Sequence, residues 1–117
     1  MTEYTERVIY FIKNIPKGKV LTYGRVALLA GNPKGARQVS WVLRSMTEKY
    51  DLPWHRVISS KGIISIKDDA GYCLQKDLLL TEGISFDSKD KIDLDKYIWD
   101  GVVENDFSFF DREEALF

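Results

Sequence analysis

A tight turn between two short helical segments is the feature that most constrains how this chain can fold. Residues 22–31 begin with threonine, a good helix N-cap, and end with glycine, which often closes a helix. Residues 36–47 again carry apolar side chains at helical spacing, and the Asn-Pro-Lys-Gly segment between the two favours a turn. This arrangement predicts a helix-turn-helix. Its second helix carries side chains able to contact a nucleic acid, namely Arg37, Gln38, Ser40 and Arg44.

The remaining predicted elements are two further helices and one small β-hairpin. Apolar spacing predicts a first helix over residues 3–14, with Thr2 as its candidate N-cap. It also predicts a last helix over about 72–82, with Leu74 and Leu78 turned inward and Leu79 as a further candidate. Residues 57–66 hold two short β-type runs around Lys-Gly, which predicts a hairpin. The expected fold is therefore mostly α with a small β-hairpin.

Composition limits the class of protein. A length of 117 residues fits one domain, and 44% hydrophobic with 30% charged residues is ordinary for a soluble globular chain. Charges interrupt every apolar run, and the N-terminus lacks the pattern of a signal peptide, so we expect an intracellular protein without a membrane span. One cysteine and one histidine make an internal disulfide impossible and a zinc site unexpected; no metal or cofactor is predicted.

The charge is unevenly distributed along the chain. The net charge is −1, but residues 102–117 carry −4, which leaves +3 for residues 1–101. A modestly basic body is compatible with binding to phosphates. We therefore expect a DNA-binding domain over residues 1–101 and an acidic, Phe-rich tail over 102–117, which either contacts a partner protein or packs passively.

The segment 52–58, Leu-Pro-Trp-His-Arg-Val-Ile, carries the most specific signal. It resembles the Pro-Cys-His-Arg-Val signature of the DNA alkylguanine alkyltransferases, in which the cysteine accepts the alkyl group. Here Trp54 stands where that cysteine would be, a variant similar to the alkyltransferase-like proteins, which bind alkylguanine lesions without transferring the group. Further matches in order and spacing extend the resemblance over roughly residues 4–101.

The resemblance implies a winged helix-turn-helix-like domain, similar to the C-terminal domain of the O6-alkylguanine-DNA alkyltransferases. It implies a protein that is not an enzyme, because alkyl transfer needs a thiolate nucleophile and an indole offers none. The implied function is that of a monomeric damage sensor. It would dock in the minor groove of duplex DNA containing O6-alkylguanine, flip the damaged base out, and flag it for nucleotide excision repair proteins.

The resemblance also assigns two groups of site residues. Arg37 is expected to enter the duplex in place of the flipped nucleotide, and Arg56 to brace the pocket through backbone carbonyls. Lys67 stands where an arginine is expected and lacks its flat, forked head. The expected lesion pocket comprises Tyr23, Trp54, His55, Arg56, Val57, Ser60 and Lys67. The expected DNA contacts are Thr22, Tyr23, Arg37, Gln38, Ser40 and Arg44.

Two positions suggest that the catalytic network of the transferases has been dismantled. Asp77 matches the position of the acid that pairs with the motif histidine, and Met46 replaces a polar asparagine. With no thiol to activate, His55 is expected to be structural or to hydrogen-bond a base edge.

The sequence leaves two other functions open. One is an enzyme, either a residual alkyltransferase using Cys73 or a glycosylase-like activity, although Cys73 is expected to be a small, semi-buried apolar residue. The other is a helix-turn-helix regulator that reads undamaged sequence, in which case binding should ignore the lesion.

Overall fold

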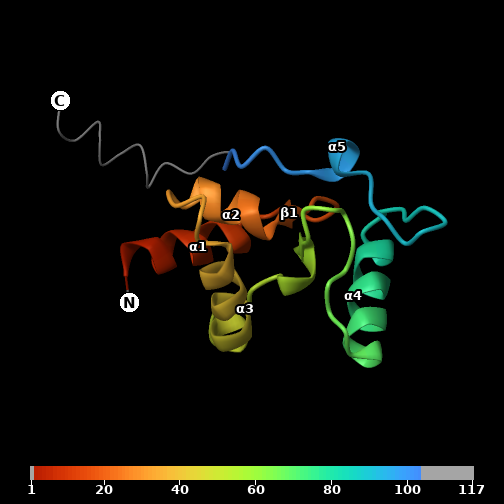
Figure 1. The fold of residues 1–117 in the computed structure, drawn as a ribbon, viewed down its shortest axis with the longest axis horizontal. Coiled ribbons are helices and arrows are strands. Elements are labelled where there is room, and N and C mark those ends of the chain that lie inside the picture. The colour runs from red at the N-terminus through yellow and green to blue at the C-terminus, as the bar shows by residue number, and fades with distance from the viewer. Residues whose placement is uncertain (1, 104–117) are drawn as a thin grey trace.

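The structure is a computed structural model that describes residues 2–103 (Figure 1). Its elements, in chain order, are α1 (Glu3–Lys13), β1 (Leu21–Thr22), α2 (Tyr23–Leu29), α3 (Ala36–Tyr50), the 3-10 turn η1 (Trp54–Arg56), β2 (Val57–Ile58), α4 (Asp69–Thr81) and α5 (Leu94–Tyr97). The prediction of a mostly helical fold is confirmed. Most of the tail predicted over residues 102–117, from residue 104 onward, lies outside the described residues.

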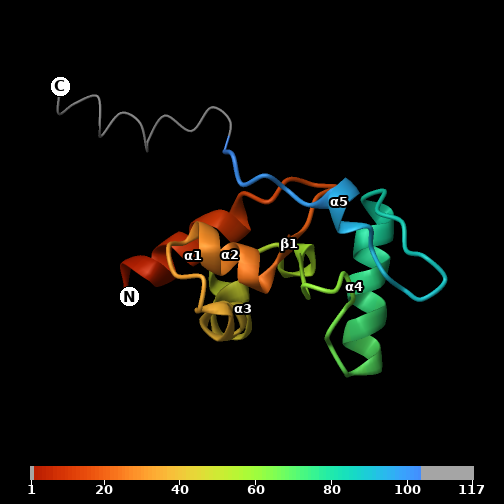
Figure 2. The same cartoon turned by 45° about the horizontal axis from the view of Figure 1, so that its top comes forward.

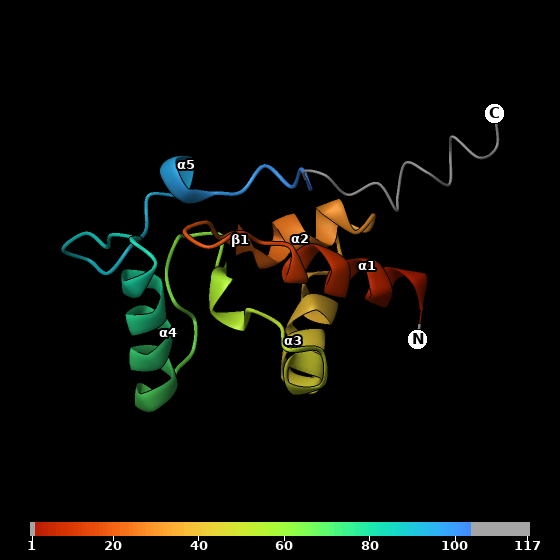
Figure 3. The ribbon, with the colours of Figure 1, turned by 180° about the vertical axis from the view of Figure 1, so that it is seen from behind.

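Helices α1, α2 and α3 pack together, and α4 stands apart from them at the other end of the molecule (Figures 1 and 3). The predicted caps are confirmed, because the side chain of Thr2 accepts from the Thr5 amide and that of Thr22 from the Arg25 amide. Burial of apolar side chains supplies most of the packing energy of such a cluster. The largest fully buried side chains of this core are Val8, Ile12, Ile15, Leu21, Val26, Val39, Val42 and Val57. None of the helices within residues 2–103 combines the length and the apolar character needed to cross a bilayer.

The helix-turn-helix is present as α2 and α3, joined by residues 30–35. Gly31 has a φ of +104°, a conformation that side chains rarely adopt, which explains a glycine at the end of α2. Gly35 allows α1 to approach closely, since a Cβ there would overlap the hydroxyl of Tyr4. Helix α3 runs three residues beyond the predicted end at Thr47, because nothing after that residue stops a helix until Asp51, which has a φ of +51°.

The prediction of a β-hairpin over residues 57–66 is wrong. Strand β2 pairs in parallel with β1, with Leu21 opposite Val57. Residues 59–63 do form a turn, in which the Gly62 amide donates to the Ser59 carbonyl over 2.9 Å. The chain then departs from β2, and the Gly62 carbonyl accepts from the amide of Ile92 over 2.8 Å. Hydrogen bonds to distant segments thus replace the local pairing that the sequence pattern favoured.

A second, smaller core lies beneath α4. Its buried members are Val20, Ile58, Ile64, Leu79, Ile84, Ile92 and Tyr97. Helix α4 begins at Asp69, earlier than predicted, because Asp68 caps it by accepting from the Gly71 amide. Leu74 was expected to face inward but is 52% exposed, and the neighbouring Gln75 holds the inward position instead. The inward face of α4 was predicted wrongly at this position because a polar residue, Gln75, occupies the buried side of the helix.

The segment after α5 ties the two cores together. In Figure 2 it runs from α5 back over the α1–α3 side of the molecule. The Val20 amide donates to the Tyr97 carbonyl over 3.0 Å, and the Trp99 amide donates to the Val20 carbonyl over 2.9 Å. Since Tyr97 belongs to the smaller core and Trp99 to the larger one, this segment fixes their relative position.

Candidate functional site

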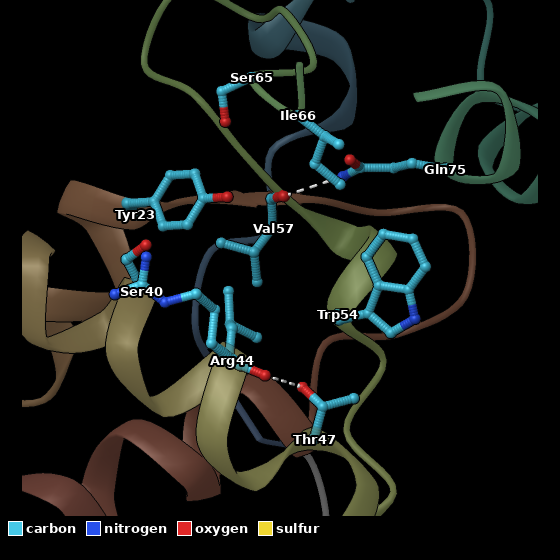
Figure 4. Close-up of a pocket in the computed structure, with 10 residues that line it drawn as sticks. Tyr23, Ser40, Arg44, Thr47, Trp54, Val57, Ser65, Ile66 and Gln75 are labelled. Atoms are coloured by element: carbon cyan, nitrogen blue, oxygen red, sulfur yellow. Dashed lines mark hydrogen bonds between the residues drawn. The ribbon is translucent and has the colours of Figure 1, made fainter. Parts of the chain in front are cut away.

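A cavity of about 490 Å³ opens between α3, the η1 turn and α4 (Figure 4). Its volume lies in the range typical of sites for small molecules, roughly 300–1,000 Å³. The residues that line it are Tyr23, Ser40, Leu43, Arg44, Thr47, Trp54, Val57, Ser65, Ile66 and Gln75. These come from five different parts of the chain, so the cavity exists only in the folded protein.

Two aromatic side chains stand on either side of Val57 at this cavity (Figure 4). Tyr23 is the first residue of α2, and its position follows from the Thr22 cap. Trp54 is the first residue of η1. Its backbone amide donates to the Leu52 carbonyl over 2.8 Å. The two rings give the cavity flat, apolar surfaces suited to a planar guest.

Helix α3 contributes the polar wall of the cavity. Ser40, Arg44 and Thr47 lie four and three residues apart, which places them on one face of the helix. Arg44 is exposed, whereas Ser40 and Thr47 are partly buried. Arg37 and Gln38, at the beginning of the same helix, are both exposed. The first turn of α3 contains no acidic residue, so this helix presents a cationic surface beside the cavity.

Gln75 connects α4 to the floor of the cavity. It is 3% exposed, and its Nε2 donates to the carbonyls of His55 and Val57 over 3.0 and 3.1 Å. Because carbonyls at the end of a 3-10 turn need donors when buried, this amide stabilises the turn that carries Trp54. Its structural role was not predicted, although a glutamine among the apolar positions of a helix is a usable signal.

A partly buried ionic cluster adjoins the η1 turn. Glu82 accepts hydrogen bonds from His55 at 2.7 Å, from Arg56 at 2.7–3.1 Å and from the Gly18 amide at 3.1 Å. Burial raises the pKa of Glu82, but the hydrogen bonds from Arg56, His55 and Gly18 outweigh it and lower the pKa to about 2. The carboxylate is therefore ionised at neutral pH. The predicted bond from Arg56 to a backbone carbonyl is confirmed, with Ile15 as acceptor at 2.9 Å.

The prediction that Asp77 occupies the place of the acid beside His55 is wrong. Asp77 is exposed on α4, whereas Glu82 follows the last residue of that helix and makes the contact. The chain turns at Gly83, which has a φ of +89°. Glu82, the residue before this turn, contacts His55 of η1. A glutamate directly before a helix-closing glycine was the available signal.

The structure brings together three of the seven residues predicted for the pocket, namely Tyr23, Trp54 and Val57. His55 and Arg56 direct their side chains to Glu82 instead. Both remaining residues, Ser60 and Lys67, are exposed and do not line the cavity. Five further residues line the cavity without having been predicted from the sequence, namely Leu43, Thr47, Ser65, Ile66 and Gln75.

The predicted DNA-contact residues fall into three groups. Tyr23, Ser40 and Arg44 line the cavity, and Arg37 and Gln38 are exposed on α3. Thr22 is buried, with its hydroxyl engaged as the N-cap of α2. The role of Thr22 that the structure shows is to cap α2, the helix that begins with Tyr23.

Cys73 lies outside the cavity. It was expected to be semi-buried but is exposed on α4, and it is not among the lining residues. Within residues 2–103, no group of three or more histidine, cysteine, aspartate or glutamate side chains is placed to hold a metal ion.

Residues 3–84 match the model of the family described as 6-O-methylguanine DNA methyltransferase, DNA binding domain. The chain belongs to this family. The resemblance is confirmed, and so is the expected mostly helical fold similar to the DNA-binding domain of this family.

Within the family, the chain is similar to proteins named for DNA base flipping and for their likeness to alkyltransferases. It is 43% identical over 96 residues to the DNA base-flipping protein of Escherichia coli, covering 82% of this chain and 74% of that protein. It is 39% identical over 104 residues to Alkyltransferase-like protein 1 of Schizosaccharomyces pombe, covering 85% and 96%. The crystal structure of S. pombe Atl1 in complex with damaged DNA containing O6-carboxymethylguanine matches with a TM-score of 0.73 and 40% identity, over 85% of this chain and 96% of that one.

Proposed function

We propose that this protein is a non-enzymatic sensor of DNA damage that binds O6-alkylguanine in duplex DNA. In this proposal the damaged base leaves the helix and enters the cavity beside Trp54. The observation that carries the proposal is that the indole of Trp54 lines the cavity. By the resemblance of the motif at residues 52–58, this is the position at which the transferases carry their acceptor cysteine. The family membership and the relatives named for base flipping and alkyltransferase likeness support it.

The chemistry of the cavity suits a flipped purine. Tyr23 and Trp54 offer flat surfaces, and Ser40 and Ser65 offer hydroxyl groups for a base edge. Extruding a base costs a few kcal/mol, and the cost is smaller for an alkylated guanine because it pairs poorly. Selection for damage thus arises both from the cheaper extrusion and from the fit of the base.

Helix α3 is proposed to enter the minor groove. Arg37 is exposed at its beginning, where a planar, permanently charged guanidinium can take the place of the extruded base and donate to its orphaned partner. Minor-groove contacts carry little sequence information, which suits a protein that must find damage in any sequence.

Base flipping can be tested with 2-aminopurine placed next to O6-methylguanine in a short duplex. Extrusion of the damaged base unstacks its neighbour, so the 2-aminopurine fluorescence should rise on binding, and Arg37→Ala should suppress the rise. A complex that forms without any change in fluorescence would contradict flipping.

The absence of transfer can be tested by the intact mass of the protein. Alkyl transfer requires a thiolate, and Cys73, the single cysteine, is exposed outside the cavity. After incubation with excess duplex containing O6-methylguanine, the mass should be unchanged. A gain of one methyl group, lost in a Cys73→Ser variant, would establish an alkyltransferase instead.

A sensor without repair chemistry must pass its lesion on. We propose that this protein acts as a monomer inside the cell and marks the lesion for nucleotide excision repair proteins. Reconstituted excision on a duplex with one O6-methylguanine should be faster when this protein is added. An unchanged or slower rate would show that excision repair does not receive the lesion from it.

A further inference from the structure

Trp41 is a large aromatic residue on the outer surface of α3. It is 45% exposed, and no ring or cation–π partner holds its indole within the described residues. Its neighbour Ser40 lines the cavity, but Trp41 does not, because one residue turns the helix by about 100°. Trp41 therefore lies beside the cavity on the exposed surface of α3 and does not line it.

The surroundings of Trp41 on α3 are cationic. Arg37 precedes it by four residues and Arg44 follows it by three, spacings that place all three side chains on neighbouring positions of the helix surface. Both arginines are exposed, and neither forms an ion pair with a carboxylate of residues 2–103. The result is one indole between two unpaired guanidinium groups.

We infer that Trp41 is a duplex-docking residue whose indole packs into the groove of DNA beside the flipped nucleotide. The inference rests on the proposed function, since it requires α3 to lie in the groove. Proteins that bind the minor groove combine arginines with apolar side chains that press against sugars and base steps. The stripe of Arg37, Trp41 and Arg44 has this composition.

Charge favours DNA over an apolar protein surface as the occupant. A protein partner that buried Trp41 would also have to desolvate Arg37 and Arg44, which is costly without matching carboxylates. The groove of DNA presents phosphates along both edges and apolar sugar walls between them, so it satisfies both arginines and the indole.

The position of Trp41 also determines what it contributes. Because Trp41 lies outside the cavity, it contacts the duplex and not the flipped base. Its contribution to affinity is therefore the same for damaged and undamaged DNA, whereas a cavity residue such as Trp54 contributes only when a base has been flipped.

The test is a comparison of Trp41→Ala with Trp41→Phe, using labelled duplexes that differ only in guanine or O6-methylguanine, by fluorescence anisotropy at fixed salt. Trp41→Ala should weaken binding to both duplexes by about tenfold, and Trp41→Phe should restore most of it. Leu80→Ala, a similarly exposed apolar residue on α4 at 46%, is the matched control and should bind like the unmodified protein.

Two results would overturn the inference. One is unchanged affinity of Trp41→Ala for both duplexes at an unaltered melting temperature. The other is a loss confined to the damaged duplex, which would place Trp41 with the lesion. Failure of the proposed function can be distinguished from both results. In that case the unmodified protein would bind the damaged and the undamaged duplex with equal affinity. Binding of Trp41→Ala to undamaged DNA remains informative in that case.

Discussion

The Nε2 atom of His55 lies 2.7 Å from Oε2 of Glu82, and Arg56 donates to the same carboxylate. This contact joins the end of α4 to the η1 turn, and η1 begins with Trp54. Neither His55 nor Glu82 lines the cavity. The pair therefore holds the cavity wall in place and has no contact with the space that a base would occupy.

The first prediction concerns stability in acid. The pKa of Glu82 is lowered from 4.5 to about 2 in the folded protein, so the unfolded chain binds the extra proton first as the pH falls. The stabilising contribution is complete above about pH 5 and is lost progressively down to about pH 2, by roughly 3 kcal/mol in total. Urea unfolding followed by tryptophan fluorescence at several pH values measures this slope.

Glu82→Gln should flatten that slope, because the amide does not titrate, and it should lower the stability at pH 7, because it leaves the guanidinium of Arg56 without its counter-charge. Asp77→Asn, a substitution at an exposed acid on α4, serves as the control and should keep the slope. An equally steep acid loss in Glu82→Gln would show that other carboxylates cause it.

The second prediction concerns Gln75. In Gln75→Glu, a carboxylate replaces the amide that donates to the His55 and Val57 carbonyls. The free energy of unfolding at pH 7 should fall by about 1–3 kcal/mol or more, since two buried acceptors lose their donor and face a negative charge. Thermal unfolding measures the loss, and Cys73→Ser, two residues away on the exposed side of α4, should be neutral. A stable Gln75→Glu variant would mean that α4 does not depend on this contact.

The third prediction concerns Arg37. Arg37→Ala should weaken binding to a duplex with O6-methylguanine by at least tenfold, about 1.4 kcal/mol, because nothing fills the space of the extruded base. Lys49→Ala removes one positive charge from the last turn of the same helix and serves as the control for general charge effects. Equal affinities of these two variants would remove Arg37 from the flipping step.

The fourth prediction concerns Trp54. Trp54→Ala should reduce the preference for the damaged duplex, with little change in binding to undamaged DNA, because this indole lines the cavity. The pattern is the opposite of that expected for Trp41→Ala. Parallel losses on both duplexes would indicate that Trp54 supports the fold and not the lesion.

Features determined by local interactions were predictable from the sequence. The caps formed by Thr2 and Thr22 and the buried valines of α2 and α3 follow from short-range patterns, and the structure agrees. The position of Trp54 was found through its motif neighbours. The motif at residues 52–58 was informative because residues elsewhere in the chain also match the family in order and spacing.

Features determined by distant contacts were not predictable. Val57 pairs with Leu21 and not with its sequence neighbours, so the expected hairpin does not form. Likewise Glu82 meets His55 across 27 residues, and the turn at Gly83 decides which acid does so. Hydrogen-bond partners at such separations depend on the packing of whole helices, which a one-dimensional pattern does not specify.

The most direct test of the proposed function is an equilibrium titration of two short duplexes that are identical except for guanine or O6-methylguanine at one position. The salt concentration must be fixed, because contacts to phosphates make affinity depend on it. The proposal predicts clear preference for the damaged duplex, with the methyl group still on the DNA afterwards. Equal affinity for both duplexes would contradict it and would favour a helix-turn-helix protein that binds DNA without regard to the lesion.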